Sequence, residues 1–558
     1  MALGRCRAHV LLASGLLALI LAHEGAGVAA AQPDAVAAEQ ALHDDIRVRI
    51  EQLRADPHLV VGGDRLFAPR VVAAFFEGRA FAPVWTVRHD VANAILAIRN
   101  IERDGLAPAQ YHLAAIERRQ ADRSKNRAGE ADLEVLITDA LAAMLDHVQF
   151  GKVSPAALDP DWNVDPRETA PPLETLIEMV AGAPSVVAGV ERFIPSHFIY
   201  VGLKQALQRY RSYASQGGWP SVPGGPTLKP GTSDRRVVAL RKRLAATGEL
   251  AASADLESPE FDEGLQAAVK LFQDANRLTP DAAIGRSTLE ALNVTAAARV
   301  EQVRVNLERA RWVLSGLHDT FVLVNLPAFK VYFIRQGRNV WETRAQVGKT
   351  ARKTPTFRDD IEYLVFNPDW VVPPTILSQD VLGPMRRGDD AVARKNLQVI
   401  DRSGKRVDPS TIDWSSARSS NFQYTLRQAP GANNALGRVK FVFPNEHTIF
   451  LHDTPSRELF AADQRTFSSG CIRVEHALEF ARLLLEGDST WTDDHVREVL
   501  DSGKTETVFL SESVPILIVY WTVSVGEAGD VRFARDIYGF DLPLARALDA
   551  APSPGAVR

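Results

Sequence analysis

Cysteine is scarce in this chain: only two cysteines occur among 558 residues, at positions 6 and 471. Two cysteines are too few for the disulfide framework that stabilises many small secreted domains. Cys471 with one or two nearby histidines also falls short of the four ligands of a structural zinc site, so zinc is the weaker interpretation. The role of Cys471 therefore has to be sought in its local sequence.

Long apolar runs and cofactor motifs are also missing. After the N-terminal segment, no stretch approaches the roughly 20 apolar residues of a transmembrane helix. No glycine-rich phosphate loop and no metal-ligand cluster with convincing spacing occurs, so we expect no cofactor. The formal net charge of -5 gives no reason to expect a nucleic-acid partner. With 46% hydrophobic and 24% charged residues, the composition indicates a globular protein of three or more domains.

Residues 1–31 have the pattern of a secretory signal peptide. Arg5 and Arg7 precede an apolar stretch at residues 10–22, and residues 28–31 read Val-Ala-Ala-Ala, an A-x-A type cleavage site. We therefore expect export to the periplasm, with a retained N-terminal anchor as the alternative. Because Cys6 would leave with the signal, Cys471 is the only cysteine expected in the mature chain.

The sequence around Cys471 favours a nucleophile. A small-residue turn, Ser468-Ser469-Gly470, precedes it, and apolar residues at helical spacing follow from Ala477. A thiol just ahead of a helix N-terminus is expected to have a lowered pKa. His452 lies nineteen positions upstream, at the end of a strand-like run at residues 448–451, and is the candidate general base.

A purely structural interpretation also has to be considered for each residue. A lone buried cysteine is commonly a small apolar core residue, and a histidine at a strand end is commonly just hydrogen-bonded. The combination of both residues, with glycine before the cysteine and Arg473 after it, favours catalysis.

The first half of the chain divides into two helical parts. Residues 35–225 carry apolar side chains at intervals of three and four, which predicts a helical scaffold domain. Residues 217–231 are dense in glycine and proline and indicate a boundary. Residues 232–294 then predict three short helices.

This three-helix unit resembles the small peptidoglycan-binding domain. Phe272-Gln273 matches the Phe-Gln pair of that family, and Gly285 to Leu292 matches its Gly-x-x-Thr-x-x-x-Leu ending. The Asp-Gly turn of the family is changed here to Asp281-Ala282. A spacer that binds no ligand is the alternative.

Residues 316–540 contain short β-rich runs separated by turn signals, which predicts a mainly-β sandwich or barrel-like domain rather than an α/β fold. Inside this domain, residues 375–427 look helical and polar, and we expect a mobile cap insertion over the site. Residues 541–558 are assigned to a C-terminal tail.

The whole arrangement resembles an L,D-transpeptidase of the YcbB type with a YkuD catalytic domain. That family has a histidine followed, after a spacer of similar length, by Ser/Thr-His-Gly-Cys, and its YcbB branch has serine at the position of Ser469. Further matches are the segments 367–373, 427–431, 434–437 and 443–445. Glu475 departs from the asparagine that relatives often carry.

The resemblance implies acyl transfer on cell-wall stem peptides. Cys471 would attack the carbonyl of the L-centre of meso-diaminopimelate and release the terminal D-alanine, with His452 as the base. The backbone carbonyl of Asp453 would orient the imidazole. The N–H groups of Gly470 and Cys471 are the candidate oxyanion hole.

Four further residues are candidates for substrate binding: Arg473, Ser469, Tyr424 and Trp370. Arg473 would hold a substrate carboxylate through its bidentate fork, or alternatively form a salt bridge that fixes the cysteine turn. The two aromatic residues would line a donor groove, although aromatic residues are more often part of a core.

The resemblance also implies partners and roles. Peptidoglycan stem peptides and glycan strands are the expected partners, peptidoglycan synthases are further candidates, and carbapenems are expected to acylate the enzyme. Cell-wall biogenesis and cell shape are the implied processes. The alternatives are a cell-wall cysteine peptidase, acting as L,D-carboxypeptidase or endopeptidase, and a non-catalytic peptidoglycan-binding scaffold. The acceptor stays open among a stem peptide, a free D-amino acid and a lipoprotein lysine.

Overall fold

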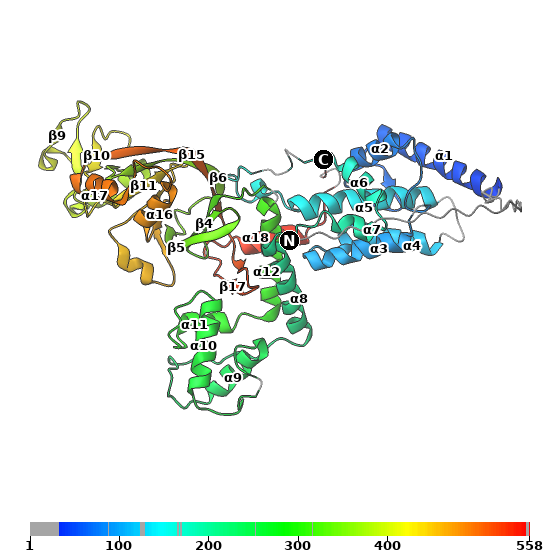
Figure 1. The fold of residues 1–558 in the computed structure, drawn as a ribbon, viewed down its shortest axis with the longest axis horizontal. Coiled ribbons are helices and arrows are strands. Elements are labelled where there is room, and N and C mark those ends of the chain that lie inside the picture. The colour runs from blue at the N-terminus through cyan, green and yellow to red at the C-terminus, as the bar shows by residue number, and fades with distance from the viewer. Residues whose placement is uncertain are drawn as a thin grey trace, which may run out of the picture.

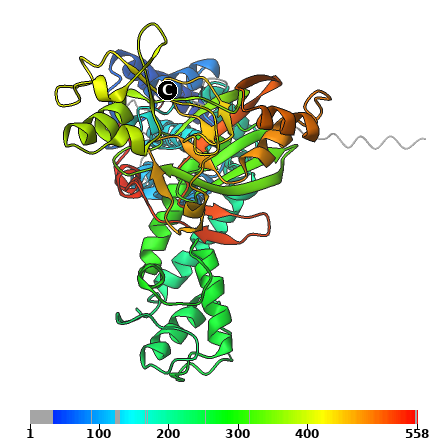
Figure 2. The same cartoon turned by 90° about the vertical axis from the view of Figure 1, so that its left-hand side faces the viewer.

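The computed structural model describes residues 33–557 except 88, 123–128, 165–166, 168–169, 252, 315 and 554–556. The predicted signal segment and Cys6 lie outside the described residues. The molecule is elongated, with a helical region at one end, a β-rich region at the other and a small helical unit projecting from the middle (Figure 1). Figure 2 shows the projecting unit below the β-rich end.

The helical region is built around α5 (Glu130–Phe150), which is buried along almost its whole length. Two buried carboxylates on α5 bind loop backbone. Glu134 accepts hydrogen bonds from the amides of Val84 and Thr86 at 2.9 and 2.7 Å, and Asp139 accepts from the amides of Phe67 and Ala68. The other elements here are α1 (Pro33–Ala55), β1 (Val60–Val61), β2 (Asp64–Arg65), α2 (Pro69–Gly78), α3 (Val91–Asn100), α4 (Leu113–Asp122), α6 (Leu173–Ala181), α7 (Val186–Glu191) and α8 (Phe198–Ser215).

Later parts of the chain complete this helical core. Helix α12 (Ala296–Leu314) packs along α8. Residues 541–558, assigned from the sequence to a tail, begin with helix α18 (Asp541–Asp549), which packs on α12. Trp521 and Leu544 belong to the same hydrophobic core as Leu207. The helical and β-rich regions therefore share one continuous apolar interface.

The small projecting unit has its own core and contains the three predicted helices, α9 (Arg236–Thr247), α10 (Glu263–Ala275) and α11 (Arg286–Leu292). The Gln273 side chain binds the 281–288 turn: it donates to Asp281 at 2.9 Å and accepts from the amide of Ala282 at 2.8 Å. Ala282 has a φ of 63°, in the left-handed region where glycine is preferred. The turn expected from the glycine-containing family is thus kept, with the alanine methyl group buried.

The β-rich region is a closed, barrel-like sheet. Its strand order is β13-β5-β14-β12-β11-β6-β15-β3-β4, and β4 also pairs with β5, which closes the ring. Helix α16 (Ala477–Leu484) packs on it through Phe480, beside α17 (Asp493–Ser502). The predicted mainly-β, barrel-like fold is confirmed. The strands are β3 (Phe321–Asn325), β4 (Lys330–Arg335), β5 (Arg338–Gly348), β6 (Phe357–Phe366), β11 (Val439–Val442), β12 (Leu451–His452), β13 (Thr466–Ser468), β14 (Ile472–Val474) and β15 (Glu506–Val519), with a separate hairpin of β16 (Val523–Val525) and β17 (Val531–Phe533).

The cap insertion is only partly helical. Short helices fill its first part: α13 (Pro374–Ile376), a π-helix (Leu377–Leu382), α14 (Gly383–Arg386) and α15 (Ala391–Arg394). Four short strands then pair in the order β7-β10-β8-β9, namely β7 (Trp370–Val371), β8 (Gln398–Ile400), β9 (Arg406–Val407) and β10 (Thr425–Gln428). The expectation of a helical insertion is therefore wrong for residues 398–427. These strands are two to four residues long, too short to show an alternating pattern in the sequence.

Candidate active site

Four neighbouring strands bring the candidate residues together. β12 and β14 run parallel and pair His452 with Arg473. On either side, the register places Lys440 of β11 opposite His452 and Gln346 of β5 opposite Arg473. The residues that alternate with these four, Ala345, Phe441, Leu451 and Ile472, belong to the barrel core. Because successive side chains of a strand point to opposite faces, the four polar side chains form a row on the other face of the sheet.

Cys471 directly precedes β14, next to this row. The charges of Lys440 and Arg473 act on its thiol as well as on the imidazole of His452. The thiol is partly exposed and lies 3.7 Å from the carbonyl oxygen of Thr448. Thr448 has a φ of 56° and belongs to a turn, so the predicted strand at 448–451 is reduced to its last residue and His452.

The His452 ring is held by its own neighbour in the chain. Nδ1 lies 2.5 Å from the carbonyl oxygen of Asp453. A carbonyl only accepts hydrogen bonds, so Nδ1 carries the proton and Nε2 of the neutral ring keeps its lone pair. Burial lowers the pKa of His452 to about 3, and the positive charge of Arg473 adds to this effect. The imidazole is therefore neutral at physiological pH, as a general base requires.

The turn at 434–437 fixes the position of Asp453. The Asp453 side chain accepts a hydrogen bond from the amide of Arg438 at 2.9 Å, and the Asp453 amide donates to the carbonyl of Val439 at 2.9 Å. Gly437 has a φ of 64°, and a Cβ atom there would overlap the Asp453 side chain. Only glycine allows this close approach.

The thiol pKa differs from the sequence-based expectation. Burial raises the pKa of Cys471, although the nearby Lys440 and Arg473 charges act in the opposite direction. The expected lowering by a helix N-terminus is wrong because β14 follows Cys471 and α16 begins only at Ala477. At neutral pH the thiol and the imidazole are therefore both uncharged.

The turn before the cysteine is held at each of its three residues. Gly470 has a φ of 125°, its amide donates to Ser468 Oγ at 3.2 Å, and its carbonyl accepts from Thr354 Oγ1 at 2.7 Å. Ser469 Oγ accepts a hydrogen bond from Arg352 at 2.7 Å. The turn therefore has a defined backbone conformation before any substrate binds.

Arg473 lies in the polar row without a carboxylate partner. Its Nη1 donates to Gln346 Oε1 at 3.1 Å, and Gln346 Nε2 in turn donates to the carbonyl of Ser456. Among the described residues, Arg473 forms no ion pair, although the charge of Glu458 acts on it, and its buried Nε has no hydrogen-bond partner. The salt bridge considered from the sequence is thus not present in the described part of the chain.

Tyr424 and Trp370 pack in the cap. Both lie against the hydrophobic cluster formed by Val381, Val399 and Leu426. The contacts of the described residues do not join either ring to Cys471 or His452. Their role in a donor groove stays a prediction.

Four residues of this site lie outside the motifs recognised in the sequence: Gln346, Arg352, Thr354 and Lys440. Gln346 and Lys440 reach it through strand pairing, and the other two lie in the 349–356 loop. The 434–437 segment is recognisable in the sequence only as a family match. Its glycine was the available signal, because glycine often indicates a close backbone approach.

Comparisons with known proteins agree with this geometry. Residues 319–496 match the family model described as the L,D-transpeptidase catalytic domain, YkuD. This part of the chain is a YkuD L,D-transpeptidase catalytic domain. Residues 70–207 match a scaffold domain, and residues 233–292 match a "putative peptidoglycan binding domain".

One similar curated protein is a "putative L,D-transpeptidase" of Haemophilus influenzae, 35% identical over 241 residues. The match spans 43% of this chain and 48% of that protein, about half of its length. A crystal structure of an L,D-transpeptidase from Xylanimonas cellulosilytica is 14% identical, covering 53% of this chain and 99% of that one, with a TM-score of 0.16. A fused Zn-dependent amidase/peptidase/peptidoglycan-binding protein from Clostridium acetobutylicum is 13% identical, covering 53% and 100%, with a TM-score of 0.14. At such TM-scores neither structure adds to the assignment.

Within the described residues, no group of three or more His, Cys, Asp or Glu side chains is arranged to hold a metal ion. None of the helices described is long and apolar enough to span a bilayer.

Proposed function

We propose that this protein is a periplasmic L,D-transpeptidase that joins meso-diaminopimelate residues of two peptidoglycan stem peptides through a thioester on Cys471, with release of D-alanine. The observation that supports the proposal is the pairing of β12 with β14 and β11, which sets Arg473 and Lys440 opposite His452. The charges of Arg473 and Lys440 act on both the His452 imidazole and the Cys471 thiol. The YkuD match supports the reaction class.

Acylation begins from the neutral pair. As Cys471 Sγ attacks the carbonyl carbon of the donor peptide, Nε2 of His452 takes the thiol proton, and a C–S bond forms. The imidazolium then gives this proton to the leaving amine, the C–N bond breaks and D-alanine departs. The Arg473 and Lys440 charges stabilise the developing thiolate, because both favour the charged form of Cys471.

Deacylation reverses these roles. The amine of the acceptor attacks the thioester, His452 removes a proton from the attacking nitrogen, a new C–N bond forms and the C–S bond breaks. The sulfur regains the proton and the site returns to its neutral state. Water attacking in place of the amine would give the shortened peptide of an L,D-carboxypeptidase.

We assign stabilisation of the substrate oxyanion mainly to a hydrogen bond from the backbone amide of Cys471. The Gly470 amide already donates to Ser468 Oγ, and would have to exchange that partner to contribute. Arg473, with no carboxylate partner among the described residues, is suited to bind a carboxylate of the donor. Ser469 is held by Arg352 beside the nucleophile and would contact the donor from there.

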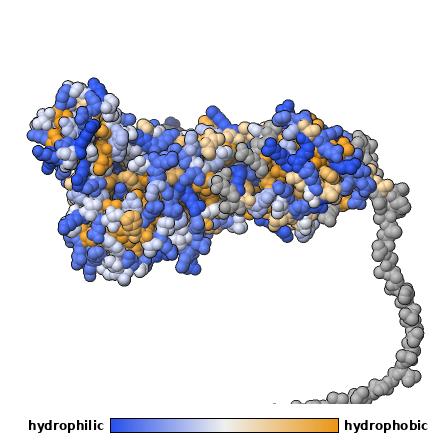
Figure 3. All heavy atoms as spheres, turned by 90° about the horizontal axis from the view of Figure 1, so that it is seen from above, coloured by the Kyte–Doolittle hydropathy of each residue, from blue (hydrophilic) through white to orange (hydrophobic). Residues whose placement is uncertain are grey.

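The remaining parts of the chain fit a cell-wall substrate. We assign the binding of glycan strands to residues 232–294 and export to the signal segment. Peptidoglycan synthases are the candidate protein partners. Seen from above, the end of the molecule with the catalytic domain shows two lobes with a hollow between them (Figure 3).

Product analysis tests the reaction. The purified protein is incubated with a disaccharide tetrapeptide, and the products are identified by mass spectrometry. A cross-linked dimer with free D-alanine is expected. A tripeptide alone would indicate a carboxypeptidase, cleavage elsewhere in the peptide an endopeptidase, and unchanged substrate a non-catalytic binding protein.

A further inference from the structure

The peptide unit between Gly470 and Cys471 is anchored from its carbonyl side. Thr354 Oγ1 donates to the Gly470 carbonyl oxygen at 2.7 Å, and this contact is buried. A trans peptide is planar, with its N–H pointing opposite to its C=O. The Thr354 hydroxyl therefore fixes the direction of the Cys471 N–H, the main oxyanion donor in the proposed reaction.

The polarity of this hydrogen bond is determined by the neighbours of Thr354. The amide of Gly348 donates to Thr354 Oγ1 at 2.9 Å. Since the Gly470 oxygen can only accept, the single hydroxyl proton must point toward it. Thr354 is 1% exposed, so no solvent competes for this proton.

Tyr538 holds Thr354 in place from the C-terminal part of the chain. Its hydroxyl accepts from the amide of Thr354 at 3.2 Å and donates to the Gly348 carbonyl at 2.6 Å. Thr354, Gly348 and Tyr538 therefore form a closed set of hydrogen bonds next to the cysteine turn. Burial raises the pKa of Tyr538, so its hydroxyl keeps its proton.

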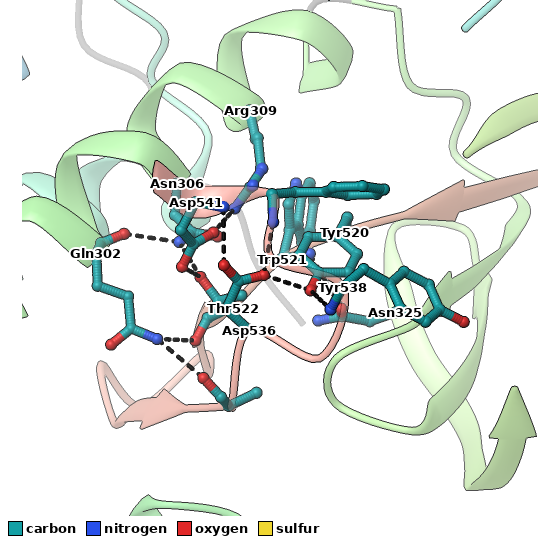
Figure 4. A network of polar contacts seen from close by, with 12 residues as sticks. Gln302, Asn306, Arg309, Asn325, Tyr520, Trp521, Thr522, Asp536, Tyr538 and Asp541 are labelled. Carbon is teal, nitrogen blue, oxygen red and sulfur yellow. Dashed lines mark hydrogen bonds and ion pairs between the residues drawn. The ribbon is translucent and has the colours of Figure 1, made fainter. Parts of the chain in front are cut away.

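The Tyr538 backbone is tied to the helical region by the network of Figure 4. Its amide donates to the Tyr520 hydroxyl at 2.7 Å, and that hydroxyl donates to Asp536 at 2.5 Å. The Asp536 carboxylate accepts a hydrogen bond from the backbone amide of Asp541. The Asp541 carboxylate in turn accepts a hydrogen bond from Nη1 of Arg309, on α12, at 2.5 Å. The residues of this network lie outside residues 319–496 of the catalytic-domain match, namely Tyr538, Tyr520, Asp536, Asp541 and Arg309.

We propose that Thr354 is a positioning residue that aims the Cys471 N–H at the oxyanion, and that Tyr538 holds Thr354 in the required orientation. The inference rests on the proposed function, since it assumes an oxyanion at this amide. It assigns to the C-terminal segment a direct part in building the active site.

Two rates measured on the same protein separate this role from a general effect on the thiol. Acylation by a carbapenem forms an oxyanion, whereas alkylation by iodoacetamide only displaces iodide. Both are followed by intact mass for wild type, Thr354→Val, Thr354→Ser and Tyr538→Phe. Thr343→Val is the matched control, because Thr343 is another buried threonine of the barrel and its hydroxyl has no hydrogen-bond partner among the described residues.

We expect the carbapenem to acylate Thr354→Val about 10- to 100-fold more slowly than wild type, a smaller loss than removal of a whole oxyanion donor would cause. The rate of alkylation by iodoacetamide should stay within about two-fold of wild type, because that reaction forms no oxyanion. Thr354→Ser keeps the hydroxyl and should restore acylation, and Thr343→Val should match wild type in both reactions. Tyr538→Phe should also slow acylation without slowing alkylation, but by a smaller factor than Thr354→Val. If Thr354→Val does not fold, the two rates of Tyr538→Phe test the inference.

Equal acylation of Thr354→Val and wild type would overturn the inference while leaving the proposed function intact. A parallel fall of both rates would also overturn it, because the hydroxyl would then act on the thiol itself. Absence of acylation in the wild type would contradict the proposed function instead.

Discussion

Arg352 forms a two-point ion pair with Asp380, with Nη1 and Nη2 at 2.7 and 2.8 Å from the two carboxylate oxygens. The same Nη1 donates to Ser469 Oγ at 2.7 Å. Asp380 belongs to the π-helix Leu377–Leu382 of the cap, and Ser469 belongs to the turn before the nucleophile. One guanidinium thus joins the cap to the catalytic turn, and π-helical turns of this kind are frequent at functional sites.

The first prediction concerns the cap. Asp380→Asn keeps the side-chain shape but removes the ion pair, so the cap should close less well over the thioester and admit water. For a partly exposed pair worth about 0.5–1 kcal/mol, the ratio of hydrolysed tripeptide to cross-linked product should rise about two- to five-fold. Asp389→Asn is the control, because Asp389 pairs with Arg394 elsewhere in the cap. A ratio that stays at the wild-type value would show that the ion pair is only structural.

The second prediction is the pH dependence of acylation. An ordinary histidine would lose its basic form near pH 6.5, but the pKa of His452 is lowered to about 3 by burial. The carbapenem acylation rate should therefore remain close to its plateau down to about pH 5. Measured rates between pH 4 and 8 decide this, and a midpoint near 6.5 would contradict a buried neutral imidazole.

The same shift predicts an effect on stability. Because the folded pKa lies below the unfolded value, the unfolded state binds more protons in the interval between them. The contribution of neutral His452 is complete above about pH 6.5 and is lost as pH falls toward 3. The free energy of unfolding in urea should thus fall less between pH 7 and 5 in His452→Gln than in wild type. His147, whose pKa is also lowered to about 3 by burial, contributes equally to both proteins.

The third prediction concerns Gly437. Gly437→Ala places a side chain at a positive φ and against the Asp453 side chain. We expect a loss of about 1–3 kcal/mol in the free energy of unfolding. Displacement of Asp453 should also release the His452 ring and slow the carbapenem acylation rate. Gly404→Ala, at a positive φ in an open cap turn with nothing near its Cβ, is the comparison and should lose stability without losing activity.

The fourth prediction is that the projecting unit binds the wall and does no chemistry. Its two ends lie together, since a Cβ on Gly218 would lie 3.5 Å from the Ala296 methyl group and Trp219 donates to the Val294 carbonyl at 3.0 Å. Residues 219–294 can therefore be replaced by a short glycine-serine linker. Co-sedimentation with isolated sacculi should fall, while the carbapenem acylation rate should stay near that of the full chain. Undiminished sedimentation would make the unit a spacer.

Local sequence predicted the elements whose residues lie close together in the chain. The Gly-Cys turn and the three-helix unit around Gln273 were recognisable because their contacts join residues a few positions apart. Thr354 and Tyr538 were not, because their hydrogen bonds to the cysteine turn and to Gly348 join distant segments. The sign of the thiol pKa shift is set by the burial of Cys471, which the local sequence does not reveal. The expected opposing effect of a helix N-terminus is missing because Ile472–Val474 form a strand before the helix begins.

The most direct test of the central claim is to trap the acyl-enzyme. The full chain is mixed with a disaccharide tetrapeptide, quenched in acid within seconds and analysed by intact mass and peptide mapping. We expect an added mass equal to the donor minus D-alanine, located on Cys471, removed by hydroxylamine and absent from Cys471→Ala. An adduct on another residue, or one that persists in Cys471→Ala, would contradict the claim.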